Sequence, residues 1–313
     1  MTVRDNNIKK KNNLMPVKHK DEINRLNKEI EILKDEIESQ KEELETRRDL
    51  AEKQRDEIIT QKKELTDSIT YACRIQSSLM PGSELFKKSF SDYFILNKPK
   101  DIVSGDFYWI SVKGSKTVVA VSDCTGHGVP GAFMSMLGIG LLNEIVNEIN
   151  IFQPNLILNN LRDMVIKSLA QSRGNTETMD GMDIALITID RGKHTLQYSG
   201  ANNSLIMIRN NKLSEIRGDR MPVGFYRITD IPFTNHEIEI KANNSIYLFS
   251  DGYKDQFGWR NNRKLKHNKF IELLLSIQNV PMKAQKILLE NNLKNWMGDL
   301  EQIDDILVVG VQV

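Results

Sequence analysis

Hydrophobic residues recur at every seventh position along the N-terminal quarter of the chain. Counted from Ile23, the heptad a positions are all apolar: Ile23, Ile30, Ile37, Leu44, Ala51, Ile58, Leu65 and Ala72. The d positions are apolar near both ends of this segment but polar between them, at Gln40, Arg47, Gln54, Gln61 and Ser68. Apolar a positions sustained over this many heptads predict a coiled coil, and the polar d positions predict one of only moderate stability.

We therefore expect residues 21–81 to form a coiled-coil and linker helix that pairs with a second copy of the chain. A flexible polar tail over residues 1–20 would precede the helix, and Pro81 with Gly82 would end it. Two interpretations of this helix stay open. It is a passive dimerisation rod, or it is a relay helix whose polar seam leaves two arrangements close in energy.

Beyond residue 84 the heptads give way to short β-branched runs that alternate with helical patterns. We predict strands at 93–96, 107–112, 117–122, 183–189, 195–199, 205–208, 245–249 and 306–311. Helical patterns cover about 130–149, 155–172, 267–278 and 282–296. Strands at hairpin spacing, interrupted by pairs of helices, favour an α+β layered domain over residues 84–313 rather than regular βαβ winding.

Composition and charge limit the location and the partners. Lys and Arg total 43 against 42 for Asp and Glu, so no global field favours nucleic acid or an anionic membrane. The only cysteines, Cys73 and Cys124, are too few for a disulfide framework, which indicates a reducing cytoplasm. The longest apolar stretch, 132–146, is shorter than the roughly 20 residues that cross a bilayer. We expect a cytoplasmic protein without a membrane span or a nucleic-acid partner.

Four short motifs place aspartates at the ends of predicted strands. They are Ser104-Gly105-Asp106 before FYWISV, Ser122-Asp123 after VVAV, Ser250-Asp251-Gly252 after IYLF, and Asp304-Asp305 before ILVV. A single such aspartate is more often a turn residue. Four at sheet rims, in a chain with few His and Cys residues, match the oxygen ligands that Mg²⁺ and Mn²⁺ prefer. Two such ions can lower the pKa of a shared water and hold a phosphoryl oxygen.

Six motifs in one order also carry a family resemblance. VSGDFYW, VAVSDCTGHGVPGAFMS, YSGANN, MPVG, LFSDG and QIDDILVVGV resemble the sporulation stage II protein E (SpoIIE)/RsbU branch of the PPM metal-dependent serine/threonine phosphatases. The likeness covers nearly all of residues 90–313. It implies a sandwich of two antiparallel sheets with helices outside and two Mn²⁺ or Mg²⁺ ions at one end. It also implies hydrolysis of phosphoserine or phosphothreonine on a partner protein, often a STAS-type antagonist of an anti-sigma factor.

The same resemblance implies a role for each matching position. Asp106 and Asp123 would bind metal, with Asp123 bridging both ions, and the backbone carbonyl of Cys124 would bind one of them. Asp251 and Asp304 would complete the second site, and these four aspartates would act in catalysis through the metal-activated water. The neighbour of Asp304, Asp305, more often supports the first residue of such a pair.

Two departures limit these assignments. Animal-type relatives carry a histidine two residues after the bridging aspartate and an arginine that clamps the phosphate, whereas here His127 comes four residues after Asp123 and no matching arginine is evident. We therefore interpret His127 as a polar turn residue rather than a general acid. Asp180 and Asp183 would either serve a third, weaker metal or cap a strand.

One other interpretation of the function is excluded by the sequence, and another stays open. The run GHGVPG at 126–131 fits the G-x-G-x-x-G dinucleotide fingerprint, but no second strand follows where that fold needs its acidic residue. The sequence favours a two-metal protein serine/threonine phosphatase regulated through its N-terminal coiled coil. The alternative is a catalytically silent coiled-coil scaffold with a phosphatase-like fold.

Overall fold

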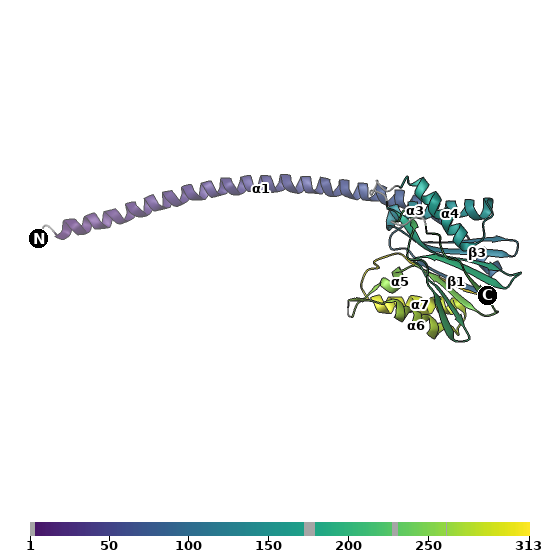
Figure 1. The fold of residues 1–313 in the computed structure, drawn as a ribbon. Coiled ribbons are helices and arrows are strands. Elements are labelled where there is room, and N and C mark those ends of the chain that lie inside the picture. The colour runs from purple at the N-terminus through teal and green to yellow at the C-terminus, as the bar shows by residue number, and fades with distance from the viewer. Residues whose placement is uncertain (1–3, 172–178, 227–230, 261) are drawn as a thin grey trace. The chain divides into compact units, whose positions relative to one another are not determined.

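The computed structural model describes residues 4–171, 179–226, 231–260 and 262–313, with side chains from residue 19 onward. The chain divides into two compact units, Met1–Asp67 and Ser68–Val313. The helix α1 (Arg4–Leu79) runs through the first unit and into the second (Figure 1). It begins at Arg4, earlier than residue 21, where the sequence predicted it to start.

In the first unit, α1 presents its heptad a positions to solvent. Ile23, Leu44 and Leu65 are 56%, 65% and 62% exposed, respectively. A single helix cannot bury such a stripe, because it has no second apolar surface to pack against. The predicted pairing with a second chain stays a prediction.

The second unit contains two antiparallel sheets. One has the strand order β1 (Asp92–Lys98), β13 (Ile306–Gln312), β10 (Ser245–Phe249), β6 (Leu205–Arg209) and β7 (Lys212–Ile216). The other has the order β2 (Phe107–Lys113), β3 (Lys116–Cys124), β4 (Gly181–Asp190), β5 (Thr195–Ala201) and β9 (His236–Glu239), and β8 (Val223–Gly224) pairs with the start of β4.

The continuous apolar run of β3 is explained by burial on both faces of its sheet. Val119 and Val121 pack in the core between the two sheets, together with Leu248 and Val309 of the opposite sheet. Val118 and Ala120 point the other way, into a core beneath the helices. Alternate side chains of a strand face opposite sides of the sheet, so a strand covered on both sides has no polar positions.

Helices cover the outer face of each sheet (Figure 1). The second sheet is covered by α3 (Gly128–Asn143), its π-helical continuation η1 (Glu144–Glu148) and α4 (Pro154–Ser168). The first is covered by α6 (His267–Ile277) and α7 (Met282–Met297). The segment Gly128–Glu148 is apolar and long enough to cross a membrane by composition alone, yet 56% of its most apolar window is buried inside this unit.

This architecture confirms the predicted α+β sandwich of antiparallel sheets with outer helices and a long N-terminal helix. Sequence patterns missed the short or marginal elements: α2 (Ser83–Ser89), α5 (Gly252–Asp255), β7, β8, β9, β11 (Phe257–Gly258) and β12 (Arg263–Lys264). Two-residue strands have no periodicity to detect, and the edge strands β7 and β9 are largely polar.

Candidate functional site

Antiparallel pairing brings the predicted aspartates to one end of the sandwich. Asp123 near the end of β3 lies opposite Asp183 near the start of β4. Asp106 directly precedes β2, whose first residue pairs with Ser122. In the other sheet, Asp251 follows β10 and Asp304 precedes β13, at the end where these two strands pair.

The carboxylates surround a cavity of about 390 Å³. Its wall contains the predicted site residues Asp123, Cys124, Asp251 and Asp304, and it also contains Asp183 and His127. Asp106 is only 2% exposed. Within the described residues, no three His, Cys, Asp or Glu side chains are already arranged as metal ligands. The carboxylates share one site but would have to move closer together to coordinate an ion.

Mutual repulsion and burial make this site electrostatically unfavourable by itself. Burial first, and then the charges of Asp106 and Asp251, raise the pKa of Asp123 to about 10. Burial likewise raises the pKa of Asp106 well above its ordinary value. The negative charges of the neighbouring aspartates raise it further, and a hydrogen bond with Ser250 lowers it only in part. The pKa of Asp304 is raised as well, chiefly by burial.

The Oδ2 atom of Asp106 is buried without a hydrogen-bond partner. A buried carboxylate oxygen with no donor is costly unless it is protonated or neutralised by a cation. The adjacent cavity is lined by further carboxylates, which are acceptors when ionised, so a cation matches this oxygen better than they do. Oxygen ligands of this kind suit Mg²⁺ or Mn²⁺, so the residues fit the divalent ions that the sequence predicted.

Asp305 has a different job from Asp304. It is 3% exposed, and its two carboxylate oxygens accept hydrogen bonds from the backbone N–H groups of Lys100 and Gly105, both at 2.7 Å. These bonds fix the loop that leads into Asp106. The neighbouring glycine Gly252 is needed for close approach, because a Cβ there would lie 2.0 Å from the Asp305 carbonyl oxygen. This geometry fits the supporting role expected for Asp305.

The glycine turn after β3 packs backbone against backbone. Gly126 has a φ of +83°, a conformation that glycine adopts without strain. Its carbonyl oxygen lies so close to Gly131 and Gly105 that a Cβ would stand 2.2 Å and 2.5 Å away, respectively. The turn therefore joins the Asp123 motif to the Asp106 motif, and side chains at these positions would separate them.

His127 stands at the N-cap position of α3, on the rim of the cavity. Its Nδ1 lies 2.9 Å from Oδ2 of Asp101, and its Nε2 lies 3.1 Å from Nζ of Lys100. The side chains of His127 and Asp101 are 52% and 46% exposed. Sequence reasoning did not single out Lys100 or Asp101, because an exposed Lys-Asp pair in a loop carries no motif.

Of the two uncertain aspartates, only Asp183 lines the cavity. Its Oδ1 accepts a 2.8 Å hydrogen bond from the Asn202 amide, and burial raises its pKa. For Asp180, it is the backbone carbonyl that is engaged, with the amide of Gln171. Whether either aspartate binds metal stays a prediction.

Gln76 is a site residue that sequence reasoning missed. Although it belongs to α1, it is 3% exposed and lies within the second unit. Its amide nitrogen donates to the Ser104 carbonyl at 2.6 Å and to Ser135 Oγ of α3 at 2.7 Å. Its amide oxygen accepts from the Ser104 N–H at 3.2 Å. The last turns of α1 are thus bonded to the backbone two residues before Asp106.

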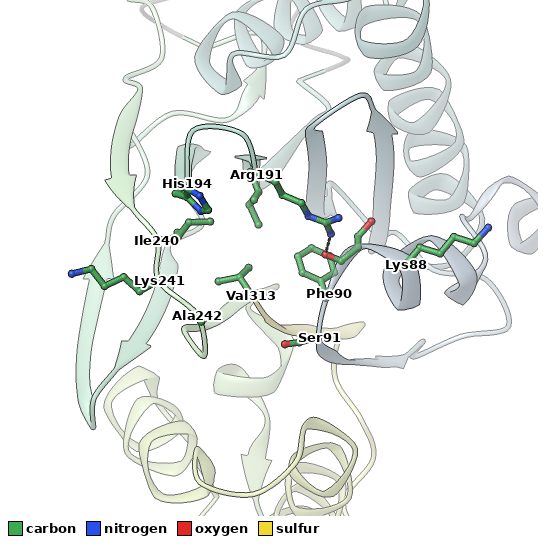
Figure 2. A pocket seen from close by; sticks show the side chains of 11 residues that line it. Lys88, Phe90, Ser91, Arg191, His194, Ile240, Lys241, Ala242 and Val313 are labelled. Carbon is green, nitrogen blue, oxygen red and sulfur yellow. Dashed lines mark hydrogen bonds between the residues drawn. The ribbon is translucent and has the colours of Figure 1, made fainter.

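A second cavity, of about 580 Å³, lies at the opposite end of the sandwich (Figure 2). β4 joins the two ends, because Asp183 near its start lines the first cavity and Ile189 near its end lines the second. Arg191 on the wall of the second cavity donates a hydrogen bond to the Ser89 carbonyl (Figure 2). The described residues that line it include three lysine or arginine side chains and His194, and no acidic side chain. The carboxylate cluster is therefore confined to one end.

Residues 113–313 match the sequence model of the family described as Stage II sporulation protein E (SpoIIE). The chain belongs to the SpoIIE family. The SpoIIE match includes Asp123, Asp251 and Asp304, whereas Asp106 lies just before it.

Individual relatives agree with this SpoIIE membership. Phosphoserine phosphatase RsbU of Bacillus subtilis (strain 168) is 24% identical over 196 residues, which are 61% of this chain and 54% of the relative. The chain thus spans about half the length of that curated relative. Among solved structures, the SiaA-PP2C domain of Pseudomonas aeruginosa has a TM-score of 0.74 and 28% identity, over 80% of this chain and 98% of that domain.

The PP2C phosphatase domain of SpoIIE from Bacillus subtilis, with a fragment of its regulatory domain, has a TM-score of 0.57 and 19% identity. That match covers 71% of this chain and 61% of the other, and it shows the fold alone. The family match confirms the predicted SpoIIE/RsbU branch, and the likeness to the SiaA-PP2C domain agrees with it.

Proposed function

We propose that this protein is a Mn²⁺- or Mg²⁺-dependent phosphatase that hydrolyses phosphoserine or phosphothreonine on a partner protein. The observation that carries the proposal is the buried, unpartnered Oδ2 of Asp106 beside a cavity lined by Asp123, Asp251 and Asp304. Carboxylates collected at this cost to stability are typical of a functional site.

Two ions would be held by the carboxylates of Asp106, Asp123, Asp251 and Asp304 and by the Cys124 carbonyl. When bound, such ions supply a water of lowered pKa and a counter-charge for the phosphoryl oxygens. Only the backbone carbonyl of Cys124 would bind an ion in this arrangement. Its side chain would play no part, in keeping with its place in the core, where Cys124 is 4% exposed. Asp305 holds the Asp106 loop in place, and Asn202 orients Asp183.

The substrate would be a phosphorylated signalling protein in the cytoplasm. A STAS-domain antagonist of an anti-sigma factor is one example. The relative RsbU carries the name phosphoserine phosphatase, which supports serine as the modified residue. The open cavity mouth also suits a protein substrate, because a phosphoserine side chain is short and must be presented from a surface.

Regulation would come from pairing of α1 with a second chain. Gln76 supports this route, because it links the C-terminal turns of α1 to Ser104 and Ser135, next to the Asp106 loop. Substitution of Ile37 and Leu44 by lysine should break the pairing and change kcat or the Mn²⁺ concentration needed for half-maximal activity. Glu38→Lys with Glu45→Lys, one position along the same helix, serves as the control. If both double variants had the same kinetics as the wild-type chain, this regulation would be contradicted.

The function itself is tested by phosphate release from a phosphoserine peptide by the purified full chain. We expect release with Mn²⁺ and none with a chelator, and we expect Asp123→Asn to abolish it. Asp190→Asn, at the far end of the sandwich, is the matched control and should keep full activity. No release by the wild-type chain with Mn²⁺ or Mg²⁺ would favour the silent scaffold instead.

A further inference from the structure

The segment that follows Asp251 is strongly basic. It comprises α5, the β11–β12 hairpin and the start of α6, and Phe257 pairs with Lys264 across the hairpin. Between residues 254 and 269 the only acidic residue is Asp255, against six basic ones: Lys254, Arg260, Arg263, Lys264, Lys266 and Lys269. Asp255 is itself neutralised by Lys264, whose Nζ lies 2.7 Å from its Oδ2.

Two tryptophans pack against side chains of this basic segment. Trp259 is 55% exposed, and the Arg260 guanidinium stands 5.2 Å from the centre of its ring. Trp296 of α7 donates its indole N–H to the Gln256 carbonyl at 2.9 Å, and Lys269 lies over its ring. Both rings bound a groove of about 340 Å³, which Arg260, Asn292 and Asn295 also line.

The hairpin is joined directly to the carboxylate site. The helix before the hairpin, α5, starts at the residue after Asp251. Gln256 accepts a 3.1 Å hydrogen bond from the Ile303 N–H, next to Asp304, and donates to the Glu301 carbonyl at 3.0 Å. The hairpin is therefore linked, through the chain and through Gln256, to the segments that carry Asp251 and Asp304.

We propose that this basic hairpin surface, formed by Trp259, Arg260, Lys269 and Trp296, docks an acidic stretch of the substrate beside its phosphoserine. The inference rests on the proposed phosphatase function and adds a substrate preference to it. Opposite charges across an interface steer encounter and discriminate between partners. Tryptophan and arginine are the residues that most often dominate binding energy at interfaces.

Acidic residues limit the extent of this basic surface. On one side it is bounded by Asp299 and Glu301, both exposed on the loop after α7. Exposed Trp259 lies against Gly298, so that a Cβ on this glycine would stand 2.7 Å from the indole ring. A docked acidic stretch would thus lie along Arg260 and Lys269 and avoid the Asp299 side.

The test uses three phosphoserine peptides of equal length, with glutamate, glutamine or lysine flanking the phosphoserine. We expect the full chain with Mn²⁺ to prefer the glutamate peptide over the lysine peptide by about tenfold in kcat/KM. Arg260→Glu with Lys269→Glu should remove or invert this preference but leave p-nitrophenyl phosphate hydrolysis unchanged. Trp259→Ala should lower kcat/KM for all three peptides. Lys193→Glu, an exposed change at the far end of the sandwich, is the control.

Binding of an unphosphorylated glutamate-rich peptide, followed by fluorescence anisotropy, separates the two proposals. Peptide binding that the double variant loses, without phosphate release by any form, would refute the phosphatase and keep the docking surface. Phosphate release without a charge preference, or a preference that the double variant retains, would overturn the docking surface alone. Tighter binding of single-stranded RNA than of the acidic peptide would overturn it as well. Circular dichroism checks that each variant is folded.

Discussion

The two ends of strand β4 each carry an aspartate, and the two behave in opposite ways. Asp183 lines the carboxylate cavity, and burial raises its pKa even though Asn202 donates a hydrogen bond to it. Asp190 is exposed to solvent at the other end, where slight burial is outweighed by hydrogen bonds from Ser115 and Gly192, so its pKa is lowered. The two aspartates lie seven residues apart along this strand, which separates them by about 23 Å.

The difference separates an end where charge is compensated from an end where it is not. At the Asp190 end, the Asp190 carboxylate has two hydrogen-bond donors, and the lining of the neighbouring cavity contains no acidic side chain. At the Asp183 end, several carboxylates face one another and Asp106 keeps an unpartnered oxygen. Such an arrangement costs folding free energy until cations neutralise it.

The largest effects are expected when Asp304 and Asp305 are substituted one at a time. Asp305→Ala removes the acceptor of two backbone N–H groups in a buried loop, and it should lower the free energy of unfolding by about 2–4 kcal/mol. Asp304→Ala should abolish phosphate release but keep or raise the thermal midpoint, because it relieves repulsion. Thermal unfolding and phosphate release of both variants check this. Equal losses of stability in the two would contradict the division of roles.

The metal-free protein should become less stable as the pH rises. The pKa of Asp123 is raised from 3.8 to about 10, so its protonated form is favoured in the folded state. That contribution is fully present below about pH 4 and is lost as the pH rises towards 10. We expect the thermal midpoint with a chelator to fall by on the order of 10 °C between pH 5 and pH 9. Mn²⁺ should reduce this fall, and Asp123→Asn should flatten it; a midpoint that rises with pH would refute the sign.

Gln76→Ala tests how far the carboxylate end depends on the last turns of α1. The change leaves the Ser104 N–H without its buried acceptor, while the Ser104 carbonyl keeps Ser135 Oγ at 3.3 Å, and it should cost about 1–3 kcal/mol of unfolding free energy. Because Ser104 lies two residues before Asp106, the Mn²⁺ concentration for half-maximal activity should also shift. Gln54→Ala, in the exposed part of the same helix, is the control. A Gln76 variant with unchanged metal dependence would remove this residue from the regulation.

The smallest effect is expected at the far end of β4. Asp190→Asn weakens hydrogen bonds between exposed groups and should cost no more than about 1 kcal/mol, with no change in kcat/KM. Urea denaturation and phosphate release measure the two quantities. A large loss of activity in this variant would break the contrast between the two ends.

Most of this contrast could be predicted from the sequence, and the rest depends on tertiary packing. Asp106, Asp123, Asp251 and Asp304 stand beside runs of strand-forming residues, so local patterns placed them at sheet ends. Gln76 could not be found, because a glutamine in a polar helix has no distinguishing pattern and its partners are distant in sequence. The same holds for the hairpin Phe257–Lys264, whose strands are two residues long.

The central claim, that these carboxylates form a divalent-metal site, is tested most directly by calorimetric titration of Mn²⁺ into the metal-free full chain near pH 7. We predict saturable binding in the wild type and in Asp190→Asn, and binding at least tenfold weaker in Asp123→Asn. Since the pKa of Asp123 is raised to about 10, binding should also release protons, which appears as heat that depends on the buffer. Absence of saturable binding in the wild type, or equal affinity in Asp123→Asn, would contradict the account.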